Sequence, residues 1–203
     1  MSENEFLDLS LTPQSFFRER INSASQQLNV NLNDDVEFYL VNLLIEFINP
    51  KTVNEDFQGD VLSTPLVLLL KQIVEAPEAK QAGMYRRLGD TSLYITGFFQ
   101  DYFNQKTFDI NYFIMMGSSA YHQASILSNS KDANHSSTLS ELSNKFIQFV
   151  DVVAQASDST STYKASDILN IYDRWNRCGS DRLRAILQEF GITPISAPYK
   201  IAQ

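Results

Sequence analysis

One stretch near the middle of the chain combines residue types that bind polar ligands or partners. The segment RRLGDTSLYITGFF, residues 86–99, contains Asp90, Tyr94 and Gly97, and their spacings of four and three residues place them on one side of a helix. A carboxylate accepts hydrogen bonds, and a tyrosine hydroxyl both donates and accepts them. Asp90, Tyr94 and Gly97 are therefore candidates for contact with a ligand or a partner.

The two glycines of this segment also have a packing interpretation. An interior glycine costs a helix about 1 kcal/mol relative to alanine, so Gly89 and Gly97 need an offsetting role. Without side chains they let another helix approach closely, and Asp90 then accepts hydrogen bonds from a backbone or from Arg86. We favour this interpretation, with a groove in which Asp90 and Tyr94 contact a ligand as the alternative.

A second segment, residues 110–127, is the predicted packing partner. Gly117, Ala120 and Ala124 recur at spacings of three and four and form a face of small residues. The short connection NQKTFD favours an antiparallel pair. Tyr121 and His122 lie on or beside this face and are further candidates for ligand or partner contact. Their plainer interpretation is solvent exposure or local hydrogen bonds.

A cluster of arginines near the C-terminus is a candidate anion site. Four arginines lie within the eleven-residue segment RWNRCGSDRLR: Arg174, Arg177, Arg182 and Arg184. The segment contains a predicted helix start at Ser180, whose free N–H groups and dipole favour phosphate, a nucleotide or an acidic peptide. The alternative is that these arginines pair with Asp173, Asp181 and Glu189 and lie over the surface of the bundle.

Known catalytic and metal-binding patterns are not found in the sequence. The run at 117–120, GSSA, lacks the second glycine of a GxSxG turn and follows no predicted strand. His122 and His135, the two histidines, are thirteen residues apart, one in a predicted helix and one in a predicted loop, and do not form a metal-binding pair. Cys178 is the single cysteine, and the arginines near it would lower its pKa. We predict no metal site and no cofactor.

Helical spacing and start patterns recur along almost the whole chain. Apolar residues follow one another at intervals of three and four, and helix starts are predicted at Thr12-Pro13, Asp34, Thr64-Pro65 and Thr138. The sequence predicts an all-α fold, a single-domain bundle of about seven or eight helices over residues 1–203. The predicted helices span 13–28, 34–50, 65–76, 78–103, 110–127 and 138 onward, followed by a C-terminal pair that meets at Gly179 and Ser180.

The helix at 78–103 is predicted to be central and continuous. Its apolar residues keep one phase across Gly89, which a break and a restart at Asp90 would not preserve. Polar segments near 128–137 and 157–165 are predicted to be mobile loops, and residues 192–203 an extended C-terminal tail.

Composition limits the classes of function. The 203 residues are 43% hydrophobic, enough for one sizeable core, and 24 acidic against 16 basic residues give a net charge of -8. Such an acidic chain disfavours general nucleic-acid binding. The most apolar run, VLSTPLVLLLKQIV, is too short and too interrupted for a membrane span, and the acidic start of the chain lacks the pattern of a secretory signal. We expect a cytoplasmic protein.

The segment YRRLGDTSLYITGFFQDYF, followed by INYFIMMGSSAYHQ, resembles a group of uncharacterised proteobacterial proteins. These share an LGD…GFF segment and then a tyrosine-rich helix with small residues. The resemblance covers residues 85–121, with Gly89, Asp90 and Gly97 at matching positions, and the N-terminal helices loosely. It implies a bacterial cytoplasmic protein and no particular activity.

Three functions are compatible with these patterns. We favour a non-enzymatic protein-interaction scaffold or regulatory adaptor, with an unknown protein partner or as a homodimer. The alternative is a small-ligand sensor or carrier that binds an apolar ligand in an aromatic pocket between helices 78–103 and 110–127, or an anionic ligand at the arginine cluster. A second alternative is an enzyme with a site at Asp90, Tyr94 and Tyr121, so whether the protein is an enzyme stays open.

Overall fold

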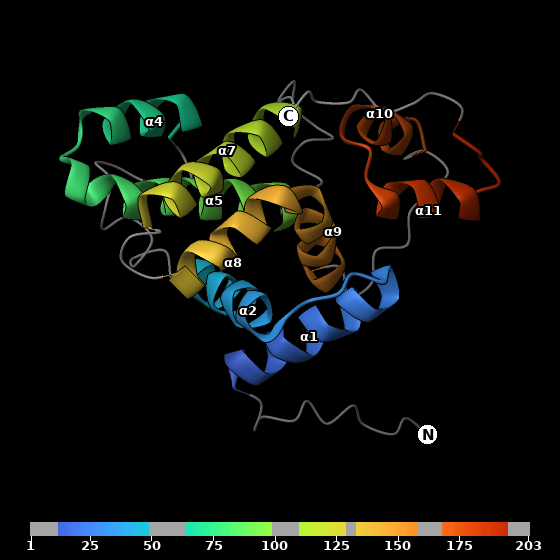
Figure 1. Ribbon diagram of the computed structural model, residues 1–203. Coiled ribbons are helices and arrows are strands. Elements are labelled where there is room, and N and C mark those ends of the chain that lie inside the picture. The colour runs from blue at the N-terminus through green and yellow to red at the C-terminus, as the bar shows by residue number, and fades with distance from the viewer. Residues whose placement is uncertain (1–11, 49–63, 99–109, 129–132, 158–167, 195–203) are drawn as a thin grey trace.

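A computed structural model of the protein describes residues 12–48, 64–98, 110–128, 133–157 and 168–194 (Figure 1). These ranges contain nine helices and no strand, in one helical body, which confirms the all-α prediction. In chain order they are α1 (Pro13–Leu28), α2 (Asp34–Ile48), α4 (Leu66–Glu75), α5 (Glu78–Phe98), α7 (Ile110–Ser128), α8 (Ala133–Asn144), α9 (Phe146–Ser157), α10 (Ile168–Cys178) and α11 (Asp181–Glu189).

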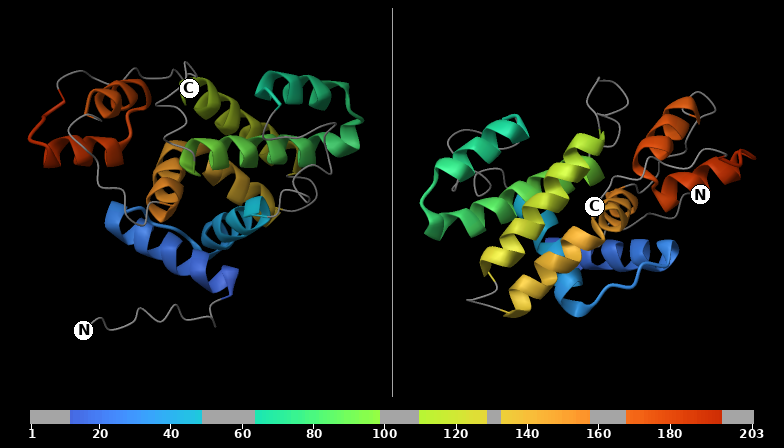
Figure 2. Two further views of the ribbon diagram at one scale, coloured as in Figure 1. Left: turned by 180° about the vertical axis from the view of Figure 1, so that it is seen from behind. Right: turned by 45° about the horizontal axis from the view of Figure 1, so that its top comes forward.

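Helix α5 lies at the centre of the body, as predicted. It packs against α2, α4, α7 and α9, while α1 and α2 pair on one side and the α10–α11 pair contacts α7 and α9 (Figures 1 and 2). The helix runs unbroken through Gly89, and its half from Arg87 to Gly97 is almost entirely buried. The predicted end of this helix at residue 103 lies outside the described residues.

Helix α7 lies antiparallel to α5 at close range. A Cβ atom at Gly89 would lie 2.7 Å from the Tyr121 ring, and one at Gly117 would lie 2.8 Å from the Ser92 side chain. Gly89 thus lies opposite Tyr121, and Ser92, three residues later on α5, lies opposite the earlier Gly117 of α7, which is the order of an antiparallel pair. A Cβ atom at Gly97 would lie 2.5 Å from Val153 of α9. The packing interpretation of these glycines is therefore confirmed, with two different helices as neighbours.

The loop prediction near 128–137 is wrong for residues 133–137. They are the first turns of α8, which begins at Ala133, while residues 129–132 lie outside the described part of the chain. Thr138 is not a cap, because its hydroxyl donates to Asn134 O inside the helix. The earlier start has a tertiary cause, since Ser136 Oγ donates to Ser125 O of α7 and ties this turn to its neighbour.

The helix predicted from residue 138 onward is in fact two helices, α8 and α9, divided at Lys145. This division accounts for a ninth helix where seven or eight were expected. Backbone bonds continue on both sides of the division, from Lys145 N to Glu141 O and from Phe149 N to Lys145 O. The chain therefore changes direction here without losing its helical hydrogen bonding.

Helix ends follow the sequence patterns at most described positions. Thr12 Oγ1 accepts from Ser15 N at the start of α1, and Ser180 Oγ accepts from Leu183 N at the start of α11. Gly179 has the predicted left-handed conformation, with a φ of 69°. At α2 the cap is Asn33 and not Asp34, because Asn33 Oδ1 accepts from Val36 N. Residues 192–194 are non-helical, and 158–167 and 195–203 lie outside the described ranges.

Candidate functional site

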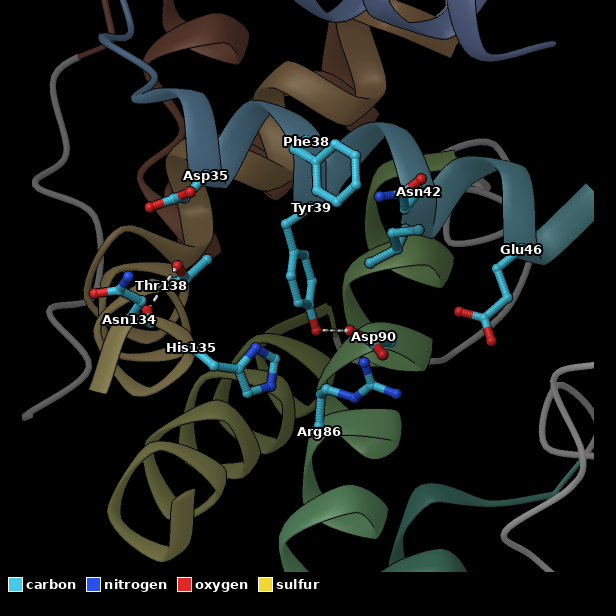
Figure 3. A pocket seen from close by; sticks show the side chains of 11 residues that line it. Asp35, Phe38, Tyr39, Asn42, Glu46, Arg86, Asp90, Asn134, His135 and Thr138 are labelled. Carbon is cyan, nitrogen blue, oxygen red and sulfur yellow. Dashed lines mark hydrogen bonds between the residues drawn. The ribbon is translucent and has the colours of Figure 1, made fainter. Parts of the chain in front are cut away.

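Asp90 lies on the wall of a pocket of about 330 Å³ formed by α2, α5 and α8 (Figure 3). The lining residues are mostly polar: Asp35, Phe38, Tyr39, Asn42, Leu43 and Glu46 from α2, Arg86 and Asp90 from α5, and Asn134, His135 and Thr138 from α8. Between α5 and α7, where an aromatic pocket was the alternative to close packing, the two helices pack directly at Gly89 and Gly117. The pocket opens on another side of α5.

Two tyrosines hold one oxygen of the Asp90 carboxylate. Its Oδ1 accepts a hydrogen bond from Tyr39 Oη at 2.5 Å, drawn in Figure 3, and one from Tyr121 Oη at 2.8 Å. Tyr121 is fully buried, and its ring fits against α5 because Gly89 has no side chain. The partners of Asp90 are thus side chains of α2 and α7, whereas the sequence suggested a backbone group or Arg86.

The pKa values of this cluster follow from its burial. Removal from water raises the pKa of Asp90, and Arg86 and the bond from Tyr39 lower it only in part. Burial, together with the Asp90 charge, raises the pKa of both Tyr39 and Tyr121 well above 10. Both tyrosines therefore keep their protons at neutral pH and act as hydrogen-bond donors to the carboxylate.

Arg86 is the basic group that faces the pocket beside Asp90 (Figure 3). It is half-buried, and although burial alone would lower its pKa, the nearby Asp90 carboxylate opposes that effect and the pKa is raised. Among the described residues no ion pair within 4 Å is formed by Arg86. Its neighbour Arg87 does form one, with Nη2 at 2.5 Å from Glu46 Oε1.

The arrangement presents unused hydrogen-bonding groups to the pocket. In the part of the chain that the structure describes, no hydrogen bond reaches Asp90 Oδ2, so this oxygen differs from Oδ1. Figure 3 shows the Arg86 guanidinium beside the Asp90 carboxylate, with His135 reaching in from α8. A strong acceptor thus lies next to a charged donor, which suits a small molecule that carries both a donor and an acceptor.

The other candidates of the central segment lie away from this pocket. Tyr94 is buried in a stack between Phe47 and Phe98, with ring centroids 4.3 Å and 5.1 Å away. Gly97 is covered by α9. His122 is exposed and lines a separate hollow of about 610 Å³ beside α8. The structure therefore brings Tyr121 to Asp90 and leaves Tyr94, Gly97 and His122 elsewhere.

The four arginines near the C-terminus do not converge on one point. Arg177 pairs with Asp173 at 2.9 Å and Arg184 with Asp181 at 2.7 Å, both on the surface and as the alternative interpretation expected. Arg174 and Arg182 are buried. Burial raises the pKa of the Cys178 thiol to about 11, which is opposite to the lowering expected from its arginine neighbours.

A carboxylate of the protein itself lies at the α11 N-terminus. Asp151 of α9 accepts from Ser180 Oγ at 2.7 Å and from Arg182 N at 3.5 Å, and Arg182 Nε donates to Gln155 Oε1. Asp151 thus occupies the place that an anionic ligand would take in the candidate anion site. Burial raises its pKa to about 6, with the Ser180 bond and Arg182 opposing that rise.

Sequence reasoning missed Tyr39 and placed His135 in a loop. A usable pattern exists in α2, where Tyr39, Asn42 and Glu46 recur at spacings of three and four in the part of the helix that follows its acidic first turn, and so share one face. His135 was missed because the helix was expected to begin at residue 138, whereas α8 begins at Ala133.

Comparisons of the chain with protein-family models, with curated proteins and with solved structures gave no match. Among the described residues, no group of three histidine, cysteine or acidic side chains is placed to hold a metal ion. The described helices include none that is both long and apolar enough to cross a membrane.

Proposed function

We propose that this protein binds a small polar molecule in the pocket between α2, α5 and α8, and acts as a sensor or carrier of that molecule. One observation carries the proposal. The Asp90 carboxylate, buried and held through one oxygen by two tyrosines, lines a pocket together with the half-buried cation of Arg86. A bacterial cytoplasmic location, implied by the resemblance of residues 85–121, belongs to the same proposal.

The cost of this arrangement supports a ligand-binding role. A carboxylate and a guanidinium lose hydration when they are buried, and a pair that is not in direct contact recovers little of that loss. A ligand that hydrogen-bonds to both would offset it. The pocket volume of about 330 Å³ lies at the lower end of the range for small-molecule sites.

The lining of this pocket does not suit the apolar or the anionic ligand that the sequence offered as an alternative for other places in the fold. Asp35, Glu46 and Asp90 are acidic, against the guanidinium of Arg86 and the imidazole of His135. A doubly charged phosphate group would meet repulsion from Asp35 and Asp90, and a purely apolar ligand would leave most of the polar lining unsatisfied.

A pair of tryptophan substitutions tests this proposal. Asn42→Trp fills the Asp90 pocket, and Ser137→Trp places the same side chain in the hollow beside His122. We expect at least one compound of a polar-metabolite panel to raise the melting temperature of the wild type and of Ser137→Trp, and not that of Asn42→Trp. Equal stabilisation of all three proteins would place the ligand elsewhere, and stabilisation of none would refute the proposal.

A second candidate, the homodimer form of the predicted interaction role, is supported by α4. Its side chains Val67, Leu68 and Val74 are 53%, 49% and 66% exposed, although apolar. Lys71 and Glu75 lie on the same side of this helix. An antiparallel pairing of two copies would bury the apolar side chains and set each Lys71 against the other copy's Glu75.

Size-exclusion chromatography with light scattering tests the homodimer. The expected result is a dimer mass for the wild type and a monomer mass for Val74→Glu. A monomeric wild type at concentrations above about 100 µM would overturn this candidate, since an interface weaker than that falls below the usual range for stable dimers.

A further inference from the structure

Among the charged side chains that line the Asp90 pocket, Glu46 forms an ion pair within the described part of the chain, whereas Asp90 and Arg86 do not, and Asp35 also lines the pocket. Glu46 is in direct contact with Arg87, which leaves it close to neutral as seen by a ligand. Asp90 and Arg86 lie one helical turn apart on α5 and face the same space without an ion pair. Their proximity still acts on both groups, because Arg86 lowers the pKa of Asp90 and Asp90 raises that of Arg86.

We propose that the ligand is a zwitterion of the α-amino-acid class, an inference that rests on the proposed binding function. In such a molecule the ammonium and the carboxylate are attached to one carbon atom. An acceptor and a cationic donor that are neighbours on one helix face match this spacing. The ammonium donates to Asp90 Oδ2, and the Arg86 guanidinium donates to the ligand carboxylate.

The tyrosines fix the orientation of the carboxylate that receives the ammonium. Tyr39 and Tyr121 come from α2 and α7 and both donate to Oδ1, so the Asp90 side chain cannot rotate without losing two hydrogen bonds. Because the two oxygens of a carboxylate point in different directions from its carbon atom, Oδ2 is directed away from both tyrosines. A preoriented acceptor loses less conformational entropy when the ligand arrives.

The rest of the lining supplies a place for the amino-acid side chain. Phe38, which is 53% exposed, lines the pocket (Figure 3). Leu43 also lines it and is buried. The amides of Asn42 and Asn134 can each donate and accept a hydrogen bond. This combination favours a side chain that is aromatic or carries an amide over one that is negatively charged, because Asp35 also lines the pocket.

Isothermal titration with three sets of compounds tests this inference on the full-length protein. The first set is the α-amino acids, the second their decarboxylated amines and the third their deaminated acids. At least one amino acid should bind, and its amine and its acid should each bind at least about tenfold more weakly, because each loses one charged hydrogen bond.

Substitutions at Arg86 locate the carboxylate contact. Arg86→Gln should weaken binding of the amino acid about tenfold or more and leave binding of the matched amine unchanged, while Arg177→Gln on the surface of α10 should change neither. Equal denaturation midpoints for the three proteins show that folding is intact. If Arg86→Gln weakens the amine as much as the amino acid, the assignment of the carboxylate to Arg86 is wrong.

The outcomes separate this inference from the proposal on which it rests. If amino acids do not bind, but another polar compound binds and is blocked by Asn42→Trp, the zwitterion inference fails and the binding function stands. If no compound of the three sets and none of the polar-metabolite panel binds to the wild type, both fail.

Discussion

Two aspartates of the described ranges are buried, Asp90 and Asp151, and they have similar burial and different surroundings. Their side chains belong to residues that are 3% and 5% exposed, and burial raises the pKa of each. Asp151 uses both oxygens, one for Ser180 Oγ and one for Arg182 N. Asp90 uses Oδ1 twice and lines a pocket. Burial alone therefore does not distinguish a structural carboxylate from a binding one.

The difference lies in what the neighbouring helices bring. At Asp151, the first turn of α11 supplies an N-terminus, so a hydroxyl and a backbone N–H meet the carboxylate directly. At Asp90, α7 approaches closely through Gly89, but α2 reaches the carboxylate only through the length of the Tyr39 side chain. Because Tyr39 bridges α2 and Asp90 with its whole length, the two helices leave a space beside the Tyr39 side chain, and this space is the pocket.

The largest effect is expected at the contact that seats Tyr121 on Asp90. Gly89→Val should lower the free energy of unfolding by about 3 kcal/mol, because its Cβ would lie 2.7 Å from a fully buried ring that cannot retreat. Gly83→Val is the matched control on the same helix, where a Cβ has nothing within 4 Å. Urea denaturation measures both, and equal losses would show that Gly89 is not a packing position.

Removing each carboxylate should separate the two aspartates by stability. Asp151→Ala should cost about 2 kcal/mol, because it leaves a buried hydroxyl and a buried N–H without their acceptor. Asp90→Ala should cost less, about 1 kcal/mol, because water in the pocket can accept from Tyr39 and only the buried Tyr121 hydroxyl loses its acceptor. If Asp90→Ala proved the more destabilising change in chemical denaturation, Asp151 would not be the more structural of the two carboxylates.

Acidification should stabilise the protein through Asp151. Its folded pKa is about 6, above the ordinary 3.8, so the folded state takes up a proton that the unfolded state does not bind until lower pH. The contribution is therefore complete below pH 3.8 and is lost as the pH rises through 6. From pH 7 to pH 5 the unfolding free energy should rise by about 1 kcal/mol more in the wild type than in Asp151→Asn.

Asp90 provides the internal control for this pH dependence. Its pKa is raised as well, so its contribution has the same sign and is kept in Asp151→Asn. Urea denaturation at the two pH values gives the comparison. An identical change in the wild type and in Asp151→Asn would contradict the assignment of the shift to Asp151.

The smallest effect is expected at the surface pairs near the C-terminus. Arg184→Ala should change the unfolding free energy by less than about 0.5 kcal/mol, because the Arg184 and Asp181 side chains are 53% and 79% exposed. Thermal denaturation in low and in high salt measures this. A larger loss would mean that the ion pair of Arg184 with Asp181 stabilises the folded protein about as much as the buried contacts of Asp151 do.

The parts of the fold that the sequence predicted correctly depend on local patterns. The unbroken phase across Gly89 predicted a continuous α5, and the small residues of both segments predicted the close antiparallel pair with α7. These features were predictable because spacing along one helix determines which residues share a face, and a missing Cβ matters only where something lies close to it.

The parts that could not be predicted depend on contacts between distant segments. The start of α8 depends on the bond from Ser136 to Ser125, and the pocket depends on Tyr39 lying beside a carboxylate 51 positions later in the chain. No local spacing encodes either contact. The anion site predicted from four clustered arginines likewise could not anticipate that Asp151, from α9, lies at the start of α11.

Nuclear magnetic resonance of the aspartate carboxyl carbons tests the central claim most directly. The signals of Asp90 and Asp151 are assigned with the Asp90→Asn and Asp151→Asn variants and followed during titration with the amino acid that binds most tightly. We predict that the Asp90 signal shifts and that its pKa falls, because an ammonium arrives beside it, while Asp151 keeps its signal and its pKa near 6. Binding that leaves the Asp90 signal unchanged, or that shifts Asp151 instead, would contradict the account.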